Sequence, residues 1–180
     1  MGETTLLGIS GSLRKGSYNT MLMREAARHF APDRFVEADL RLPLFDEDLE
    51  QAEGIPGAVQ RLADQIAEAD AVVIAGPEYN KSVSGVLKNA LDWVSRTKGN
   101  PWKDKPVAIM AATGGRAGGE RTQFALRLCM VPFRPLLLQG PEVLVGNNDQ
   151  QFDEAGRLIN ERNEKALITL MEGLRKAAAV

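Results

Sequence analysis

The sequence has almost none of the side chains on which enzymes most often rely for nucleophilic or acid–base chemistry. It contains one histidine, His29, and one cysteine, Cys129. With one of each, we expect no zinc or other metal site and no Cys-His or Ser-His-Asp catalytic group. Cys129 lies among apolar residues at helical spacing, which predicts a buried thiol in the core. Any chemistry is therefore expected to come from a bound cofactor.

A large charge of one sign and long apolar runs are missing as well. The formal net charge is −2 at pH 7, so the positive excess with which proteins bind nucleic acid or an anionic membrane is absent. The apolar runs are too short to span a bilayer, and the first residues show no signal-peptide pattern. A lone cysteine suits a reducing compartment. We therefore expect a cytoplasmic protein with no membrane insertion and no nucleic-acid partner.

What remains is an ordinary globular composition, 44% hydrophobic and 26% charged, in 180 residues. That length suits one domain, residues 1–180. Buried-strand runs alternate with helical spacing of apolar residues. Strands are expected at residues 4–9, 35–40, 71–75, 107–112 and, in two pieces of a fifth strand, 136–138 and 143–145. Helices are expected at residues 19–29, 55–66, 85–96, from the loop 113–119 to residue 130, and around 167–174.

This alternation predicts an α/β domain, a three-layer sandwich around a parallel sheet. Five strands fit the flavodoxin-like order 2-1-3-4-5, in which the loops after strands 1, 3 and 4 share the edge where ligands bind. Those loops are the three most unusual in the sequence, so one site is expected there. The connection 41–53 carries the carboxylates Asp46, Glu47 and Asp48 without a convergent partner, which favours a solvated loop over a metal site.

The loop after the first strand, residues 8–19, reads GISGSLRKGSYN. Glycines allow close approach of the backbone, and N–H groups at the start of the following helix favour an anion. Ser12, Ser17 and Asn19 add side-chain donors, and Arg14 offers a planar fork for phosphate oxygens. A Walker loop is excluded because Ser17 stands where its lysine is required, and a G-x-G-x-x-G fingerprint is absent. The loop predicts a phosphate-bearing cofactor, although a helix-capping turn would use similar residues.

The loop after the third strand, residues 76–84, offers the aromatic face of Tyr79 together with the polar side chains of Asn80 and Ser82. Such a wall suits a flat heteroaromatic group with hydrogen-bonding edges. The alternative is a capping loop in which Ser84 is the N-cap and Tyr79 packs locally. The third loop, residues 113–119, is rich in glycine.

Together these motifs resemble the NADPH-dependent FMN reductase family of flavodoxin-like proteins, which includes quinone, chromate, ferric and azo-dye reductases. The matching stretches are residues 11–19, Pro-Glu-Tyr-Asn at 77–80, Ser82, Gly85 and residues 87–93. The resemblance implies FMN as the prosthetic group. The cofactor-binding residues it implies are Ser12, Arg14, Ser17, Tyr18, Asn19 and Thr20 near the phosphate, Pro77, Glu78, Tyr79, Asn80 and Ser82 along the isoalloxazine, and Thr113, Gly114 and Gly115 near its pyrimidine side. Ser84 departs from the pattern, because the family often has proline there.

The resemblance also implies a reaction. NADPH or NADH passes hydride to flavin N5, and a small acceptor, most often a quinone, takes the electrons; chromate, ferric complexes, azo dyes and free flavin remain open. Backbone N–H groups of Gly114 and Gly115 are expected to stabilise the reduced flavin, and no side chain is expected to act as a catalytic acid or base. Family members are usually homodimers or homotetramers, with the helix after the Pro-Glu-Tyr-Asn loop near the partner. Arg96, late in that helix, is expected to reach a partner's substrate pocket; the alternative is an ordinary helix end where its charge favours the helix dipole. Arg116 is a second candidate substrate residue.

Two other functions are compatible with the same loops. A flavodoxin-type electron carrier would bind FMN but would not react with a nicotinamide nucleotide; such carriers usually have a strongly acidic docking face, and a net charge of −2 argues against one. A flavin-sensing interaction protein would bind its ligand without turnover.

Overall fold

The computed structural model describes residues 3–179 and contains one parallel sheet. The strands β1 (Thr5–Ser10), β2 (Arg34–Glu37), β3 (Ala71–Ala75) and β4 (Pro106–Ala112) form its main part in the order β2-β1-β3-β4. Every residue of β3 and β4 is buried. Helices cover both faces of a parallel sheet, so its central strands are apolar along their whole length rather than alternating.

The fifth strand of the predicted sheet is two short strands, so residues 3–179 contain six strands. β5 (Leu136–Leu137) pairs with the beginning of β4, and β6 (Val143–Val145) pairs with its end. Pro141 lies between them and has no N–H to donate to the ladder, which is consistent with the interruption. The order β2-β1-β3-β4-β5 is the predicted flavodoxin-like one.

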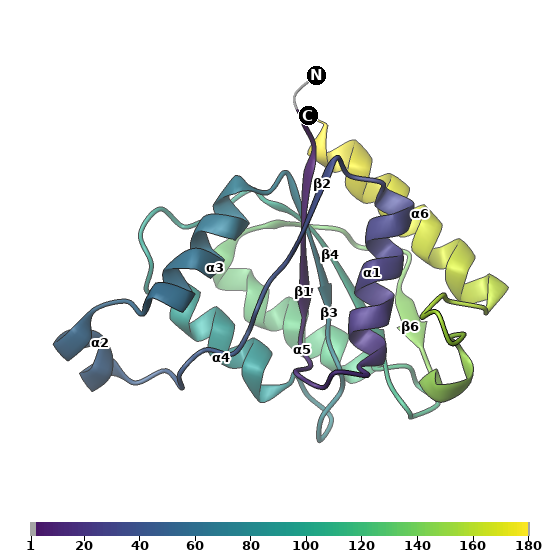
Figure 1. Ribbon diagram of the computed structural model, residues 1–180, viewed down its shortest axis with the longest axis horizontal. Helices are drawn as coiled ribbons and strands as arrows, with labels where there is room; N and C mark the ends of the chain where they lie inside the picture. Colours follow the sequence, from purple (N-terminus) through teal and green to yellow (C-terminus); the bar gives the residue numbers. More distant parts are fainter. Residues whose placement is uncertain (1–2, 180) are drawn as a thin grey trace.

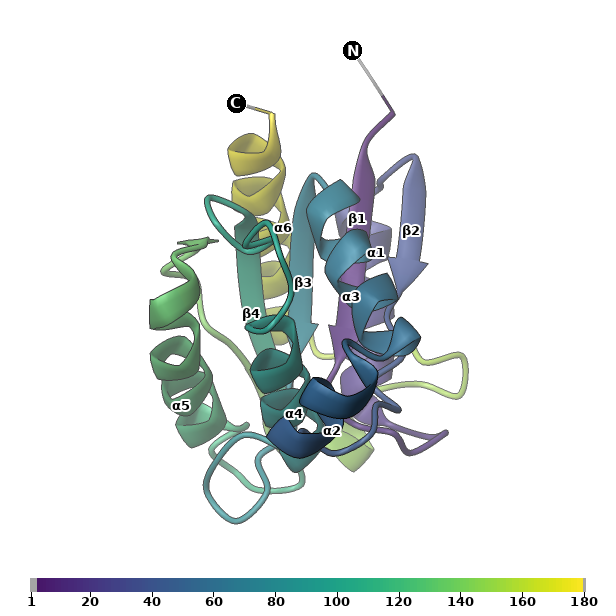
Figure 2. The ribbon, with the colours of Figure 1, turned by 90° about the vertical axis from the view of Figure 1, so that its left-hand side faces the viewer.

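Helices form the two outer layers, as Figures 1 and 2 show. On one face lie α1 (Tyr18–Phe30) and α6 (Glu161–Ala178), and on the other lie α3 (Gly57–Glu68), α4 (Gly85–Val94) and α5 (Glu120–Met130). Each face of the sheet has its own apolar core, because side chains of successive strand residues point to opposite faces. The predicted three-layer sandwich is confirmed. Within residues 3–179, none of the helices combines the length and apolar character that crossing a bilayer requires.

The acidic connection contains a helix that its sequence did not predict. α2 (Glu47–Glu53) begins at the N-cap Asp46, whose carboxylate accepts a hydrogen bond from the N–H of Asp48 at 2.9 Å. Acidic side chains in its first turn favour the positive end of the helix dipole. No residue of α2 is buried, and the helix stands away from the sheet in Figure 1. Apolar periodicity could not reveal it because α2 contributes nothing to the core.

Cys129 is less buried than predicted: it packs against the core between the sheet and α3, α4 and α5, but it is only half-buried. On α5 the core positions are Leu126 and Met130, whereas Phe124 and Leu128 are 56% and 73% exposed. The apolar spacing around Cys129 therefore belongs to two faces of the helix, only one of which meets the sheet.

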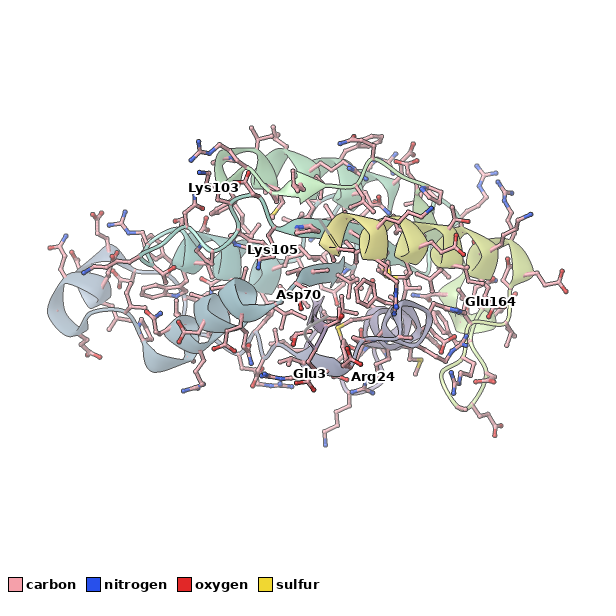
Figure 3. All side chains as sticks on the ribbon, turned by 90° about the horizontal axis from the view of Figure 1, so that it is seen from above. Glu3, Arg24, Asp70, Lys103, Lys105 and Glu164 are labelled. Carbon is pink, nitrogen blue, oxygen red and sulfur yellow. The ribbon has the colours of Figure 1, made fainter. Side chains whose placement is uncertain are left out.

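The edge at which the strands begin is held by charged groups with structural partners, and Figure 3 looks onto it. The Lys105 ammonium donates hydrogen bonds to the carbonyls of Ala67 and Ala69 at the end of α3. Burial lowers the pKa of Lys105, and the negative charge of Asp70 opposes that shift. The Asp70 carboxylate in turn accepts from the N–H of Thr5 at 2.7 Å. These contacts fasten α3 to β1 and β4 at the edge opposite the candidate site.

Two short 3₁₀ helices complete the fold, η1 (Val131–Phe133) directly after α5 and η2 (Asn148–Gln150) after β6.

Candidate functional site

The three unusual loops leave the sheet side by side, at the lower edge in Figure 1. Beyond the ends of the strands, the N–H of Gly11 donates to the carbonyl of Ala75 at 2.8 Å, and that of Gly76 donates to Met110 at 3.0 Å. The N–H of Thr113 donates to Val145 at 2.9 Å. These bonds continue the parallel ladders into the loops, so all three begin in register with one another.

The first loop ends in the N-cap of α1. The Ser17 hydroxyl, almost fully buried, accepts from the N–H of Thr20 at 3.3 Å. The Thr20 hydroxyl donates to Ser10 Oγ at 2.9 Å. Tyr18 and Asn19 form the first turn, where backbone N–H groups precede any intrahelical acceptor. A hollow of about 190 Å³ adjoins this turn, and its lining includes Ser10, Ser12, Arg14, Lys15 and Thr20.

The Asn19 side chain makes hydrogen bonds within the protein. Its buried side-chain amide donates to the carbonyl of Ala112 at 2.8 Å and accepts from the N–H of Ala112 at 3.0 Å. This pair of bonds clamps the start of α1 to the end of β4. Its side-chain oxygen and one amide hydrogen are therefore used within the protein, and its backbone N–H is the group best placed for an anion.

The second loop projects beyond β3 as a tight hairpin. Tyr79 and Ser82 exchange two backbone hydrogen bonds of 3.1 Å each, and Asn80 and Lys81 between them have φ values of 49° and 66°. Two central residues with positive φ are typical of a type I′ turn, which asparagine tolerates well. Tyr79 is 52% exposed, so about half of its surface is open to a ligand. The hairpin leaves this aromatic group free to contact a ligand.

Glu78, at the base of the hairpin, links the second loop to α5. Its carboxylate accepts from the N–H of Arg121 at 3.1 Å, and the Arg121 guanidinium lies 3.7 Å from its other oxygen. A carboxylate is favourable at this position because it faces the positive end of the α5 dipole. Pro77 precedes it in the same extended segment.

The glycine-rich third loop has an open half and a packed half. A Cβ atom built on Gly114 has no heavy atom within 4 Å, whereas one on Gly118 would lie 2.5 Å from the carbonyl carbon of Leu144. Gly118 and Gly119 also have positive φ values of 65° and 92°. The packed half therefore fixes the loop on β6, and the open half, with Gly115, presents backbone to the space above the sheet edge.

The two candidate substrate arginines lie in different places. Arg116 is exposed in the third loop, and its carbonyl packs against Gly146. Arg96 lies beyond the far end of α4 from the hairpin, where its Nε donates to the Glu50 carboxylate of α2 at 2.8 Å. Within one subunit the structure thus brings Arg116, but not Arg96, to the three loops.

Two features of this edge were not predicted from the sequence: the part that Ser10 plays and the contact that Ser84 makes. Ser10 contributes the hydroxyl that Thr20 contacts, and its position at the end of β1 was the only local signal. Ser84 occupies the N-cap position of α4, but its hydroxyl does not cap that helix and donates instead to the carbonyl of Gly11 at 2.6 Å. The sequence alone gave no indication of this contact, which joins loops 73 residues apart.

Two larger hollows lie elsewhere. One of about 540 Å³ lies beside α4 and η1, and one of about 690 Å³ lies between α1 and residues 154–157. Their size does not make them the better candidates, because the backbone donors, hydroxyls and open glycines converge at the sheet edge. Ligand orientation in α/β proteins depends on such placed polar groups.

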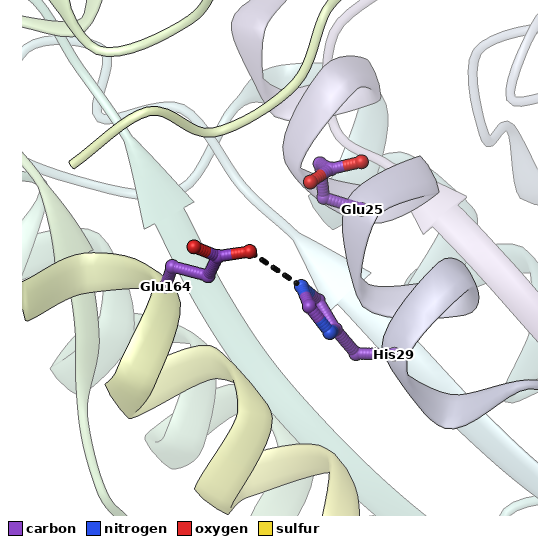
Figure 4. A group of neighbouring side chains, drawn as sticks. All are labelled: Glu25, His29 and Glu164. Carbon is purple, nitrogen blue, oxygen red and sulfur yellow. Dashed lines mark ion pairs between the residues drawn. The ribbon is translucent and has the colours of Figure 1, made fainter. Parts of the chain in front are cut away.

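Next to the larger hollow, Glu25, His29 and Glu164 bring three ligand atoms within 4.8 Å of one another (Figure 4). Two arginines already donate hydrogen bonds to these carboxylates. Arg28 donates two bonds of 3.0 Å to Glu25 and one of 3.2 Å to Glu164, and Arg157 donates to Glu25 at 3.2 Å. Guanidinium groups supply the positive charge here, so the cluster is an ion-pair network that joins α1, α6 and the loop at 153–158.

The strand order, the backbone donors at the start of α1, the exposed Tyr79 and the open glycine backbone meet at one switch point. This arrangement is that of a flavodoxin-like protein that binds a mononucleotide. The residues present fit FMN: hydroxyls, Arg14 and helix N–H groups suit its phosphate, and the hairpin and open glycine backbone suit a flat ring.

Comparisons with known proteins specify the family. Residues 4–150 match the model of the NADPH-dependent FMN reductase family. The chain is 42% identical over 174 residues to an NAD(P)H-dependent FMN reductase of Pseudomonas aeruginosa, covering 96% of this chain and 94% of that one. It is 41% identical over 155 residues to the quinone reductase of Escherichia coli K12, covering 84% and 82%. The flavoenzyme NAD(P)H:(acceptor) oxidoreductase FerB of Paracoccus denitrificans has a similar structure, with a TM-score of 0.87, 30% identity and coverage of 98% and 97%. The chain belongs to the NADPH-dependent FMN reductase family.

Proposed function

We propose that this protein is an FMN-dependent oxidoreductase that takes electrons from NADPH or NADH and passes them to a small acceptor, most often a quinone. The observation that carries the proposal is the convergence of an anion-binding helix start, an exposed aromatic hairpin and an open glycine loop at one sheet edge. Relatives that are 42% and 41% identical are named FMN reductase and quinone reductase, which supports it.

The residues at this edge would bind and orient the cofactor. Ser12, Arg14 and Ser17, with the backbone N–H groups of Tyr18 and Asn19, would hold the phosphate, and Thr20 would border it. The hairpin residues Pro77, Glu78, Tyr79, Asn80 and Ser82 would line one wall of the ring, and Thr113, Gly114 and Gly115 would line the other. When bound, FMN supplies the redox chemistry, accepting hydride from the nicotinamide and delivering electrons to the acceptor.

Backbone N–H groups, rather than acidic or basic side chains, would stabilise the reduced ring. N–H groups of Gly114 and Gly115 are fixed by the packed half of their loop and would stabilise negative charge on the pyrimidine side of the ring. Arg116, exposed beside them, would attract the negatively charged nucleotide. The proposed reaction requires no side-chain acid or base.

A turnover assay tests this function. Protein loaded with FMN is mixed with NADPH or NADH, and nucleotide oxidation is followed with and without a benzoquinone. The proposal predicts oxidation that depends on the quinone and on bound FMN. Nucleotide oxidation at the buffer rate under all conditions would rule it out.

The protein would act as a homodimer or homotetramer in the cytoplasm. Support for assembly comes from a stripe on the outward face of α5 and η1, where Phe124, Leu128 and Val131 are 56%, 73% and 66% exposed. Exposed apolar residues at neighbouring helical positions are typical of a protein interface. In such an assembly, Arg96 of one subunit would approach the substrate pocket of the other.

The single, half-buried cysteine supports a reducing compartment.

A charge placed in this stripe tests the assembly. Leu128→Lys should lower the molar mass measured by light scattering to that of a smaller species, because a desolvated ammonium would be unpaired in the interface. Leu44→Lys is the matched control, since Leu44 is 82% exposed and precedes α2, away from the stripe. Equal masses for the Leu128→Lys variant and the unchanged protein would contradict the proposed interface.

A further inference from the structure

A buried hydrogen bond connects the two loops that would hold opposite ends of the cofactor. The Ser84 hydroxyl donates to the carbonyl of Gly11 at 2.6 Å, and both residues are buried. A Cβ atom on Gly11 would lie 3.0 Å from Ser84 Oγ and 3.0 Å from the Cδ of Pro77. The two loops are therefore in close contact at this point, and the Ser84 hydroxyl is the polar group of α4 that reaches across.

The bond determines the orientation of a peptide plane in the phosphate loop. A trans peptide is planar, so its C=O and N–H groups point in opposite directions. Holding the carbonyl of Gly11 toward Ser84 turns the N–H of Ser12 away from α4. That N–H points toward Ser10 Oγ, at 3.4 Å, which itself accepts from Thr20 at 2.9 Å. The N–H of Ser12 is thereby presented to the same space as the hydroxyls at the start of α1.

We propose that Ser84 is a positioning residue for the phosphate site, through its hydrogen bond to the Gly11–Ser12 peptide. It touches neither the ring nor the phosphate. It fixes the Gly11–Ser12 peptide, whose N–H contacts Ser10 Oγ beside the start of α1, and it holds the phosphate loop at a set distance from the hairpin loop. This inference rests on the proposed binding of FMN.

Comparing FMN with riboflavin separates this role from a general effect on the fold, because riboflavin has the same ring without the phosphate. Apoprotein is titrated with each flavin, and fluorescence quenching gives the two Kd values. Ser84→Ala should raise the Kd for FMN about tenfold, roughly the effect of losing one well-formed hydrogen bond. The Kd for riboflavin should stay within about twofold.

Two further variants sharpen the test. Ser84→Thr keeps a hydroxyl and should retain most of the preference for FMN. Ser95→Ala is the matched control: it removes a hydroxyl that donates to Asp92 at 2.6 Å at the other end of α4, and the ratio of the two Kd values should not change.

Two outcomes would overturn the inference: equal weakening of both flavins in Ser84→Ala, or no change in either. An unchanged protein that binds neither flavin would instead refute the proposed function. Inorganic phosphate then tests the positioning role alone, through its effect on the melting temperature. A shift in the unchanged protein that is lost in Ser84→Ala supports the role; an equal shift in both, or no shift in either, overturns it.

Discussion

The residues at the sheet edge form two groups: some hold the loops in place, and others face the ligand. Asn19, Glu78 and Ser84 all carry polar groups that the family resemblance or the local sequence associates with cofactor binding or capping. In the structure each one bonds to another element instead: Asn19 to β4, Glu78 to α5 and Ser84 to the phosphate loop. The groups left facing outward are hydroxyls, Arg14, Tyr79 and glycine backbone, which suggests that binding relies on prepositioned main chain.

Substitutions at two glycines of the third loop test which part of the loop faces the ligand and which part holds the loop in place. Gly114→Val should leave the free energy of unfolding of the apoprotein within about 1 kcal/mol, because a Cβ there meets open space. It should weaken FMN binding about tenfold, because the added side chain occupies the ligand side.

Gly118→Val is the matched partner of that variant. It combines a φ of 65° with a backbone contact of 2.5 Å, and should cost about 3 kcal/mol or more. Urea unfolding and FMN titration of both variants check the pair. A destabilised Gly114→Val with normal FMN affinity would contradict the assignment of the open half.

At the scale of elements, α1 is held to the C-terminal part of the chain by the ion-pair network around Glu25. Burial opposes the charge of Glu25, but hydrogen bonds and the positive charge of Arg28, with the N–H of Leu158 and with Arg157, outweigh it and lower its pKa. Burial and Arg28 lower the pKa of His29 below 6.5, against the pull of Glu25 and Glu164. Since Arg28 donates to His29 Nε2 at 2.7 Å and a guanidinium cannot accept, that ring nitrogen is the acceptor of a neutral imidazole.

Stability should therefore fall with acid in two stages. As pH drops below 6.5, the unfolded chain takes up a proton on His29 that the folded state resists, so folding weakens. Below about 4.5, Glu25 binds a proton more readily in the unfolded chain, and its contribution is lost as pH falls through its lowered folded pKa. Urea unfolding of the apoprotein at a series of pH values measures both.

Two variants test which residue causes each stage of the loss of stability in acid. His29→Gln should remove the decline just below pH 6.5, and Glu25→Gln should cost about 2 kcal/mol at neutral pH because it leaves the arginines without their buried partner. A His29→Gln variant whose stability keeps the original pH profile between 7 and 5 would contradict the histidine assignment.

At the scale of the whole molecule, the sequence was most informative where a pattern is local. The buried run of β3 (Ala71–Ala75), the amphipathic helices and the glycine-rich loops follow from spacing and composition, and the strand order places those loops on one edge. Contacts between distant residues could not be predicted: Asn19 meets Ala112, 93 positions away, and Arg28 meets Glu164, 136 positions away. α2 escaped detection for another reason, since capping and the Arg96–Glu50 contact hold it without burial.

The proposed function requires that a nicotinamide nucleotide directly reduces a flavin bound to this fold. The visible spectrum of the purified protein, reconstituted with FMN if needed, is recorded before and after anaerobic addition of NADPH or NADH. We expect flavin absorption bands that bleach within seconds of adding one of the nucleotides. Flavin bands that persist with both nucleotides, or a protein whose spectrum FMN titration does not change, would contradict it.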